Sequence, residues 1–206
     1  MILMSRMEWG VVIGINLLLI ALLVPGVQQS REVARQSMSK SNLKHVAIAF
    51  YNYNDTWSYL PPGGTIREDG TAMHGWMIQN YLFMEASHLY DCVDFNNPWD
   101  SSENTPVYEW PMGCYQVPGA DANYSPTGFA LTHYQGNPNL LHRNSSVSLE
   151  QLEDGAAHHW LAGEVAGNYQ PWGYPFNWRP LGTKLCDGPN SFGHPPWSGG
   201  HLLRAD

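Results

Sequence analysis

The chain begins with an apolar stretch that gives way to a polar one without an intervening turn. Residues 9–27 contain no charged side chain, and Asn16 is their one strongly polar residue. A helix of that length spans about 28 Å, close to the hydrocarbon thickness of a bilayer. The polar stretch that follows contains neither glycine nor proline. The pattern predicts one long helix, from about Glu8 to Tyr53, bent near Pro25.

A second apolar pattern occupies the outer part of the predicted helix. Leu43, Val46, Ala47 and Phe50 recur at i, i+3, i+4 and i+7, the spacing of a helix face that packs on a domain. We expect this face to pack on the rest of the chain. A thinner apolar stripe, Val27, Ala34 and Met38, faces another way around the helix. Either this stripe meets a second neighbour, or the polar middle of the helix is a solvated stalk.

Residues 56–206 hold most of the chain's 20 glycines and 15 prolines, which predicts short strands joined by long loops. Residues 74–93 are an exception, because their large side chains recur at helical spacing. Residues 148–152 suggest a turn of helix, and residues 160–165 a strand. The predicted fold class is therefore α+β. A long N-terminal helix (residues 1–55) packs on a β-rich, loop-rich head (residues 56–206) with an antiparallel sheet.

The apolar stretch is either a retained membrane anchor or a removable signal peptide. A signal peptide has a shorter apolar core that ends at a small-residue cleavage site. Here the stretch is long and runs into Pro25-Gly26-Val27 without an A-x-A pattern, which favours the anchor. Arg6 precedes the stretch and four basic residues follow it, so the positive-inside rule alone places the head in the cytoplasm. The aromatic-rich, lysine-poor head suggests the opposite orientation.

Several residues of the apolar stretch suit contact with another helix. Gly10 and Gly14 form a G-x-x-x-G pair, which lets a second helix approach closely, although glycine is also common in membrane helices generally. Pro25 removes one backbone hydrogen bond, so the helix can bend there. Glu8 lies near the membrane face, where an ionised carboxylate needs a partner. The alternative interpretation is that Glu8 has no role in assembly and is an ordinary interfacial carboxylate beside Arg6.

Charge and cysteine content narrow the choice of partners. The net charge is −8 at pH 7, and the acidic residues concentrate in the head, which excludes nucleic acid as a main partner. The three cysteines, Cys92, Cys114 and Cys186, are too far apart in sequence for a metal or redox motif. If the head lies outside the cytoplasm, Cys92 pairs with Cys114 in one internal disulfide. The alternative is that all three are separate small hydrophobic residues.

The sequence shows no pattern typical of an enzyme. His158 and His159 are adjacent, so on a strand they would face opposite sides and could not share a metal ion. The sequence contains no G-x-S-x-G motif, phosphate-binding loop or dinucleotide fingerprint. We therefore expect no enzyme activity, no metal and no cofactor.

All but one of the nine tryptophans lie in the head, several beside proline or glycine. Exposed aromatic rings stack on sugars and on partner surfaces, so Trp99, Trp110, Trp172 and Trp197 are candidate ligand-facing residues, with glycan as the candidate ligand. The alternative interpretation is that tryptophan fills the core of a head with few long aliphatic runs.

The N-terminal features together resemble those of type IV pilins and pseudopilins: an apolar helix with a single Glu, a Pro seventeen residues later, and a polar continuation. The continuation resembles the large pilin-like family of domain of unknown function 1559, which is typical of planctomycete bacteria. That family reads Leu-Pro-Ala-Val-Gln, Arg-Glu-Ala-Ala-Arg, Asn-Asn-Leu-Lys, His-Asn-Tyr and Phe-Pro-Pro-Gly in series. The matching residues are Pro25, Val27, Gln28, Arg31, Glu32, Ala34, Arg35, Asn42, Leu43, Lys44, Asn52, Tyr53, Pro61, Pro62 and Gly63.

Later segments resemble the same family, among them DFNNPWDSSEN, LEDGAAHHWLAGEV and FGHPPWSGGHLLRAD. The resemblance therefore covers nearly the whole chain. The N-terminus differs from the pilin pattern. Counting back from Glu8 places Leu3 where pilin leaders have Gly, so the prepilin-type methylation motif is degenerate. The family pattern also continues past a terminal Asp, so we expect the last strand of the head to be cut short.

The resemblance implies a single-pass protein of the cytoplasmic membrane, with its head in the periplasm or at the cell exterior. In pilin-like assemblies the corresponding Glu pairs with the N-terminal amine of a neighbouring subunit. Glu8, Gly10, Gly14 and Pro25 are therefore the expected subunit-assembly residues. The expected function is that of a non-enzymatic envelope or surface protein that associates with other pilin-like subunits. The alternative is a membrane-tethered extracellular binding module, perhaps for glycans.

Overall fold

The computed structural model describes residues 6–84, 87–152, 155–197 and 199–206. The chain divides into two compact units, Met1–Ser37 and Met38–Asp206. The second unit begins before the residue 56 at which we expected the head to begin. The reason is that the outer part of the N-terminal helix supplies side chains to the core of the head.

Helix α1 runs without interruption from Arg6 to Trp57 and contains Pro25. This confirms the long helix that the sequence predicts, whereas the bend near Pro25 stays a prediction. Two polar side chains return hydrogen bonds to the helix backbone. The amide of Asn16 donates to the carbonyl of Val12 at 2.7 Å, and the hydroxyl of Ser30 donates to a carbonyl one turn before it at 2.8 Å.

The outer part of α1 packs on the head, as its apolar spacing predicts. Leu43, Val46 and Phe50 are buried, and Ala47 is half-buried. Ala49, which the predicted stripe omits, is buried as well. The buried face is therefore slightly wider than the four-residue stripe.

The core of the second unit is built around large aromatic side chains. The largest fully buried ones are Trp76, Trp172, Tyr108, Tyr115, Tyr134, Phe50 and Phe192. The ring of Phe50 stacks on that of Trp76, with centroids 5.1 Å apart, and so joins α1 to the core. The indole N–H of Trp76 donates to the carbonyl of Asn177 at 2.9 Å. Because the buried indole has an acceptor, its burial carries no unsatisfied polar group.

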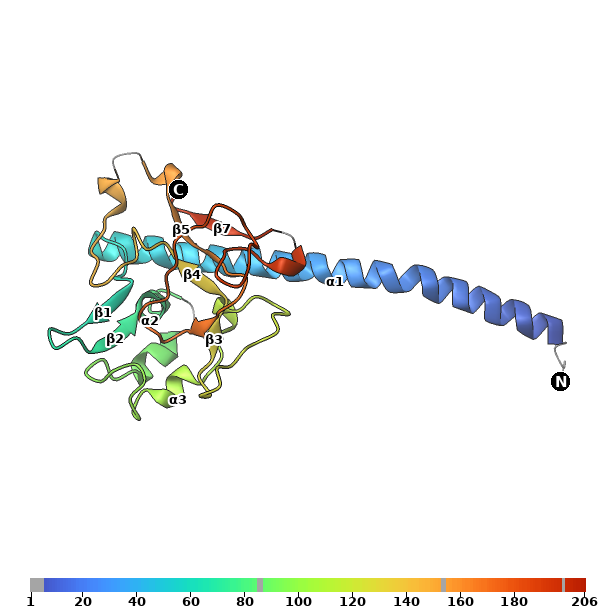
Figure 1. The fold of residues 1–206 in the computed structure, drawn as a ribbon, viewed down its shortest axis with the longest axis horizontal. Coiled ribbons are helices and arrows are strands. Elements are labelled where there is room, and N and C mark those ends of the chain that lie inside the picture. The colour runs from blue at the N-terminus through green and yellow to red at the C-terminus, as the bar shows by residue number, and fades with distance from the viewer. Residues whose placement is uncertain (1–5, 85–86, 153–154, 198) are drawn as a thin grey trace. The chain divides into compact units, whose positions relative to one another are not determined.

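Three small antiparallel sheets complete the head (Figure 1). The pairs are β1 (Gly64–Ile66) with β2 (Ala72–Gly75) and β3 (Leu131–Thr132) with β6 (Gln170–Pro171), and the three-stranded sheet has the order β4 (Tyr134–Gly136), β5 (Trp160–Glu164), β7 (Leu202–Arg204). β5 confirms the strand predicted at residues 160–165. The chain is therefore an α+β protein, as expected from its sequence.

The helices of the head are short. They are α2 (Trp76–Tyr81), α3 (Thr105–Tyr108) and the 3-10 turns η1 (Ser87–Cys92), η2 (Gly113–Tyr115), η3 (Leu149–Gln151), η4 (Ala156–His158) and η5 (Pro195–Trp197). η3 confirms the turn of helix predicted at residues 148–152. The helix predicted across residues 74–93 is shorter than expected. After α2 the backbone tightens, with N–H groups bonded three residues back, and the ring of Phe83 packs edge-on against Tyr53 of α1, with centroids 5.5 Å apart.

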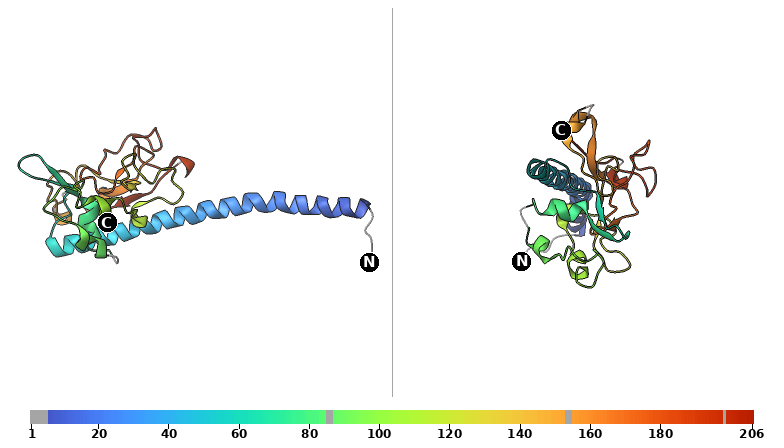
Figure 2. Two further views of the ribbon diagram at one scale, coloured as in Figure 1. Left: turned by 90° about the horizontal axis from the view of Figure 1, so that it is seen from below. Right: turned by 90° about the vertical axis from the view of Figure 1, so that its left-hand side faces the viewer.

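Two glycines allow the chain to enter the hairpin of β1 and β2, whose connecting loop projects from the head (Figure 2). The N–H of Gly63 donates to the carbonyl of His142 at 3.0 Å, and its own carbonyl accepts from the N–H of Trp76 at 3.1 Å. A Cβ on Gly64 would lie 2.0 Å from the carbonyl oxygen of Pro175. The backbone can approach so closely only because glycine lacks a side chain.

The side chain of Asn104 organises the loop that carries DFNNPWDSSEN. Its amide N–H groups donate to the carbonyls of Asp94 at 2.9 Å, Asn97 at 3.2 Å and Pro98 at 2.9 Å. Its oxygen accepts from the N–H of Asp94 at 2.9 Å. Asn104 is fully buried, so this one side chain satisfies backbone groups that water cannot reach.

Candidate functional site

The expected subunit-assembly residues all lie on α1. The backbone of Glu8 belongs to the helix, but its side chain lies outside the described residues. Gly10 and Gly14 are one turn apart and therefore share a face. A Cβ added at either glycine would meet nothing within 4 Å, so this face is open to a neighbour. Pro25 lies inside the helix, where its ring has no N–H to donate.

The apolar stretch of α1 is exposed along its length. Leu17, Leu18 and Leu22 have exposed fractions of 61%, 61% and 68%. Within the described residues, one helix, at Trp9–Trp57, is long and apolar enough to cross a membrane, and none of its most apolar window is buried. A core helix of a soluble protein would be mostly buried, whereas a signal sequence would look the same as an anchor in this respect.

The four candidate ligand-facing tryptophans differ in their surroundings. Trp110 has an exposed fraction of 63%, whereas Trp172 is fully buried in the core. Trp99 is half-buried and packs on Phe129, with ring centroids 4.8 Å apart. Trp197 is half-buried beside His194. Trp172 is therefore a core residue, as the alternative interpretation holds, and the glycan partner stays a prediction that depends mainly on Trp110.

Trp110 borders a hollow of about 420 Å³ in the second unit. Six of the residues that line it are His45, Ile48, Met84, Trp110, Met112 and Cys114. The lining is largely apolar, and its polar side chains include the imidazoles of His45 and His88 and the hydroxyl of Tyr81. Burial raises the pKa of the Cys114 thiol to about 11, so the thiol is un-ionised and unreactive at neutral pH.

The carboxylate of Glu164, at the end of β5, accepts three hydrogen bonds from two other segments of the second unit. It accepts from the hydroxyl of Ser39 on α1, from the backbone N–H of His201 at 2.8 Å, and from Nδ1 of His201 at 2.7 Å. The hydroxyl of Tyr134 lies 2.7 Å from that of Ser39. Because Ser39 gives its one proton to the carboxylate, Tyr134 is the donor in that contact.

This cluster joins four parts of the fold, and all of its members except His201 are closed to solvent. Ser39, Tyr134 and Glu164 are fully buried, and the imidazole of His201 is 22% exposed. Burial raises the pKa of the Tyr134 hydroxyl, which keeps it protonated and able to donate. Ser39 is paired with a carboxylate and not with an imidazole. The cluster holds α1 against β4 and β5.

Two further histidines are buried as neutral side chains. Nδ1 of His74 lies 3.0 Å from the hydroxyl of Tyr108, and its Nε2 donates to the carbonyl of Asn97 at 3.0 Å. Burial lowers the pKa of His74 to about 4. In His133, Nδ1 accepts from the N–H of Val117 at 2.9 Å. Burial also lowers the pKa of His133. Both rings therefore serve the fold as fixed donor–acceptor groups.

The three cysteines are free thiols, so the disulfide suggested between Cys92 and Cys114 is wrong. Cys92 is exposed at the end of η1, where its thiol donates to the carbonyl of His88 at 3.5 Å. Cys114 instead lies half-buried in the lining of the hollow. The two residues belong to separate local turns, and each thiol is placed by its own turn.

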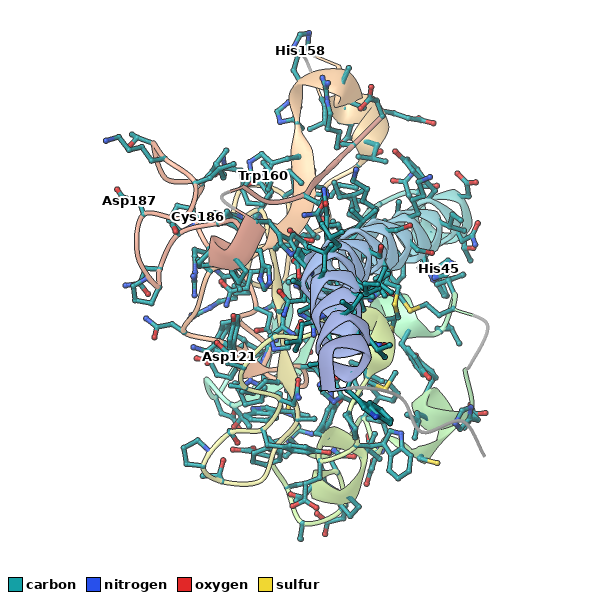
Figure 3. All side chains as sticks on the ribbon, turned by 90° about the vertical axis from the view of Figure 1, so that its right-hand side faces the viewer. His45, Asp121, His158, Trp160, Cys186 and Asp187 are labelled. Carbon is teal, nitrogen blue, oxygen red and sulfur yellow. The ribbon has the colours of Figure 1, made fainter. Side chains whose placement is uncertain are left out.

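Within the part of the chain that the structure describes, no three His, Cys, Asp or Glu side chains form a group that could hold a metal ion. The view along α1 agrees for the labelled residues (Figure 3). His45, Asp121, His158 and Cys186 come from different segments and are well separated in that view. They do not form one site.

The model of a family described as "Protein of unknown function (DUF1559)" matches residues 28–178. The match spans most of the chain, from the polar part of α1 through β6. A search of curated proteins and a search of solved structures each found no match. The matched segment includes the Asn104 loop, the glycine-dependent hairpin and all but His201 of the Glu164 cluster, and on this match the chain belongs to the DUF1559 family.

Proposed function

We propose that this protein is a non-enzymatic, pilin-like envelope protein, anchored in the cytoplasmic membrane by residues 9–27 and self-associating through its N-terminal helix. The exposed apolar face of α1 is the observation that carries this proposal. Soluble monomers rarely expose contiguous apolar surface of this extent, so either lipid or other helices must cover it. The uncharged stretch of helix at residues 9–27 also matches the hydrocarbon thickness of a bilayer in length.

The placement of polar groups in the second unit supports a non-enzymatic role. The cluster of Ser39, Glu164 and His201 has a carboxylate as its central group and a buried serine. His74 and His133 use both ring nitrogens in the fold. These groups maintain the structure, and their burial keeps them away from a substrate.

The proposed orientation places the head outside the cytoplasm. Support comes from the resemblance of the N-terminal helix to those of pilins, whose heads are exported. The acidic, aromatic-rich composition of the head is compatible with this side of the membrane. The four basic residues that follow the anchor argue for the other side, so orientation needs a direct test.

The anchor is tested by carbonate extraction of membranes from cells that express the full chain, followed by intact-mass measurement. We expect the protein to stay in the membrane pellet, with a mass that includes residues 9–27. A product that lacks these residues and dissolves without detergent would identify a cleaved signal peptide and contradict the anchor.

Self-association is tested by chemical crosslinking of the membrane-bound protein. The substitution Glu8→Ala removes the carboxylate that is proposed to pair with a neighbouring N-terminus, so we expect crosslinked oligomers to be lost. Glu68→Ala serves as a control, because Glu68 is exposed in the head. If Glu8→Ala oligomers form as in wild type, Glu8 is an ordinary interfacial carboxylate and not an assembly residue.

A further inference from the structure

Asn16 has unused hydrogen-bonding capacity inside the apolar stretch of α1. Its Nδ2 donates to the carbonyl of Val12 at 2.7 Å. A side-chain amide has two N–H donors and one oxygen acceptor. The bond to Val12 therefore leaves one N–H and the oxygen without a partner among the described residues, on an exposed side chain.

The depth of Asn16 makes this unused capacity costly in a membrane. Asn16 lies seven residues after Trp9, which is about 10 Å along the helix axis from the start of the apolar stretch. Lipid chains offer neither a donor nor an acceptor, and an unsatisfied polar group in hydrocarbon is unfavourable. A protein group at the same depth is the partner that satisfies the amide.

A second copy of this chain supplies such a group. Copies of a single-pass protein insert in one orientation, so their Asn16 side chains lie at equal depth. A side-chain amide is both donor and acceptor and thus complementary to itself, and one asparagine in an apolar helix seam is known to fix register. We propose that Asn16 hydrogen-bonds to Asn16 of a second copy within the bilayer. This rests on the proposed membrane anchor.

The contact at Asn16 uses a different helix face from the glycine pair. At 100° per residue, Asn16 lies about 120° from Gly10 and about 160° from Gly14 around the axis. Val12 and Leu23 lie on the Asn16 side, with exposed fractions of 38% and 63%, and supply apolar contact there. A helix with two contact faces joins two neighbours, so the assembly extends beyond a closed dimer.

The test is sedimentation equilibrium of the full-length protein in density-matched detergent micelles. We expect Asn16→Leu to raise the dissociation constant for self-association about three- to twenty-fold. Asn16→Gln keeps the amide and should stay within about two-fold of wild type. Ile15→Ala is the matched control, because Ile15 is exposed and lies about 100° from both Asn16 and Gly14.

Three results would overturn the proposal: Asn16→Leu associating as wild type does, Ile15→Ala being weakened as much as Asn16→Leu, or wild type remaining monomeric in micelles. Carbonate extraction of the same variants separates this failure from failure of the anchor. If wild type resists extraction, the membrane anchor is supported and only the proposal of an Asn16 contact is refuted. If carbonate releases wild type, the membrane anchor fails, and the Asn16 contact fails with it.

Discussion

The buried carboxylate of Glu164 links α1 to the segment around His201, because it accepts hydrogen bonds from both. Three donors meet at its two oxygens, and two of them come from His201. Removing the acceptor would leave the hydroxyl of Ser39 and the N–H groups of His201 facing a void. An unpaired buried donor costs more than the net gain from the original bond.

We predict that Glu164→Ala lowers the free energy of unfolding by about 3–5 kcal/mol. Glu150→Ala, at an exposed position, should change it by less than about 0.5 kcal/mol. Denaturant unfolding of the full chain in detergent, followed by tryptophan fluorescence, measures both. Equal stabilities of the two variants would show that the cluster does not hold α1 in place.

The lowered pKa of buried His74 determines the direction in which the free energy of unfolding changes with pH. Its pKa is about 4 in the folded chain and 6.5 ordinarily, so the unfolded chain binds a proton first as the pH falls. Stability is therefore complete above pH 6.5 and is lost between pH 6.5 and 4. The loss from His74 approaches about 3 kcal/mol. His133 adds to the loss in the same direction, because its pKa is also lowered.

Unfolding free energies of wild type and His74→Gln at pH 7 and pH 4.5 test this expectation. The substitution should flatten the dependence on pH, because Gln does not titrate. His45→Gln is the control, since His45 is exposed on α1, and its dependence should match that of wild type. A wild-type stability that is constant between these two pH values would contradict the prediction.

These buried polar residues could not be identified from the sequence as a group. Ser39 is 95 residues from Tyr134 and 125 residues from Glu164, and no local spacing connects them. The family resemblance included the segment that contains Glu164, but it assigned the residue no role. Trp172 shows the converse: its place between proline and glycine suggested a ligand contact, whereas its size and apolar character placed it in the core.

Among the secondary-structure elements, α1 was the most predictable. Its buried face follows from apolar spacing at 3.6 residues, and its length follows from an uncharged stretch continued by residues 28–53, which contain neither glycine nor proline. The helix at residues 74–93 was overestimated. Its spacing continues beyond α2, but contacts with α1, such as that of Asn80 with the carbonyl of Val46 at 3.2 Å, take precedence over local preference.

The close backbone packing of the β1–β2 hairpin leaves no room for a larger side chain at Gly64. Gly64→Ala places a Cβ where the carbonyl of Pro175 lies, and we expect a loss of about 2–3 kcal/mol in unfolding free energy. Gly182→Ala is a matched control, because the nearest atom to its Cβ would be 3.9 Å away. Thermal unfolding compares the two variants. A Gly64→Ala protein as stable as the Gly182→Ala protein would show that the strand can move aside.

For the molecule as a whole, fold class was predictable and the number and pairing of strands were not. Seven strands of two to five residues form three sheets in the described chain, and such short strands carry little periodic signal among glycine- and proline-rich loops. The two-unit organisation was expected, but its boundary depends on which side chains of α1 are buried in the head. Only the tertiary packing shows that the first buried side chain of α1 is that of Ser39.

Orientation in the membrane can be tested with a thiol that the protein already has. Cys92 is free and exposed, whereas Cys114 is half-buried with a raised pKa. We predict that a membrane-impermeant maleimide labels Cys92 in spheroplasts without permeabilisation. Cys92→Ser should lose most of that label. Labelling that requires permeabilisation would place the head in the cytoplasm and contradict the proposed orientation.

β5 is the strand with neighbours on both sides, between β4 and β7, whereas the other described strands are edges or belong to two-stranded pairs. Backbone amides exchange with deuterium when their hydrogen bonds open, and shielded ones open last. Deuterium uptake should therefore be slowest in β5 and along the buried face of α1, and fastest in the two-stranded pairs. The rigid centre of the protein is then a strand and a helix face joined through Ser39 and Glu164, with the remaining loops arranged around them.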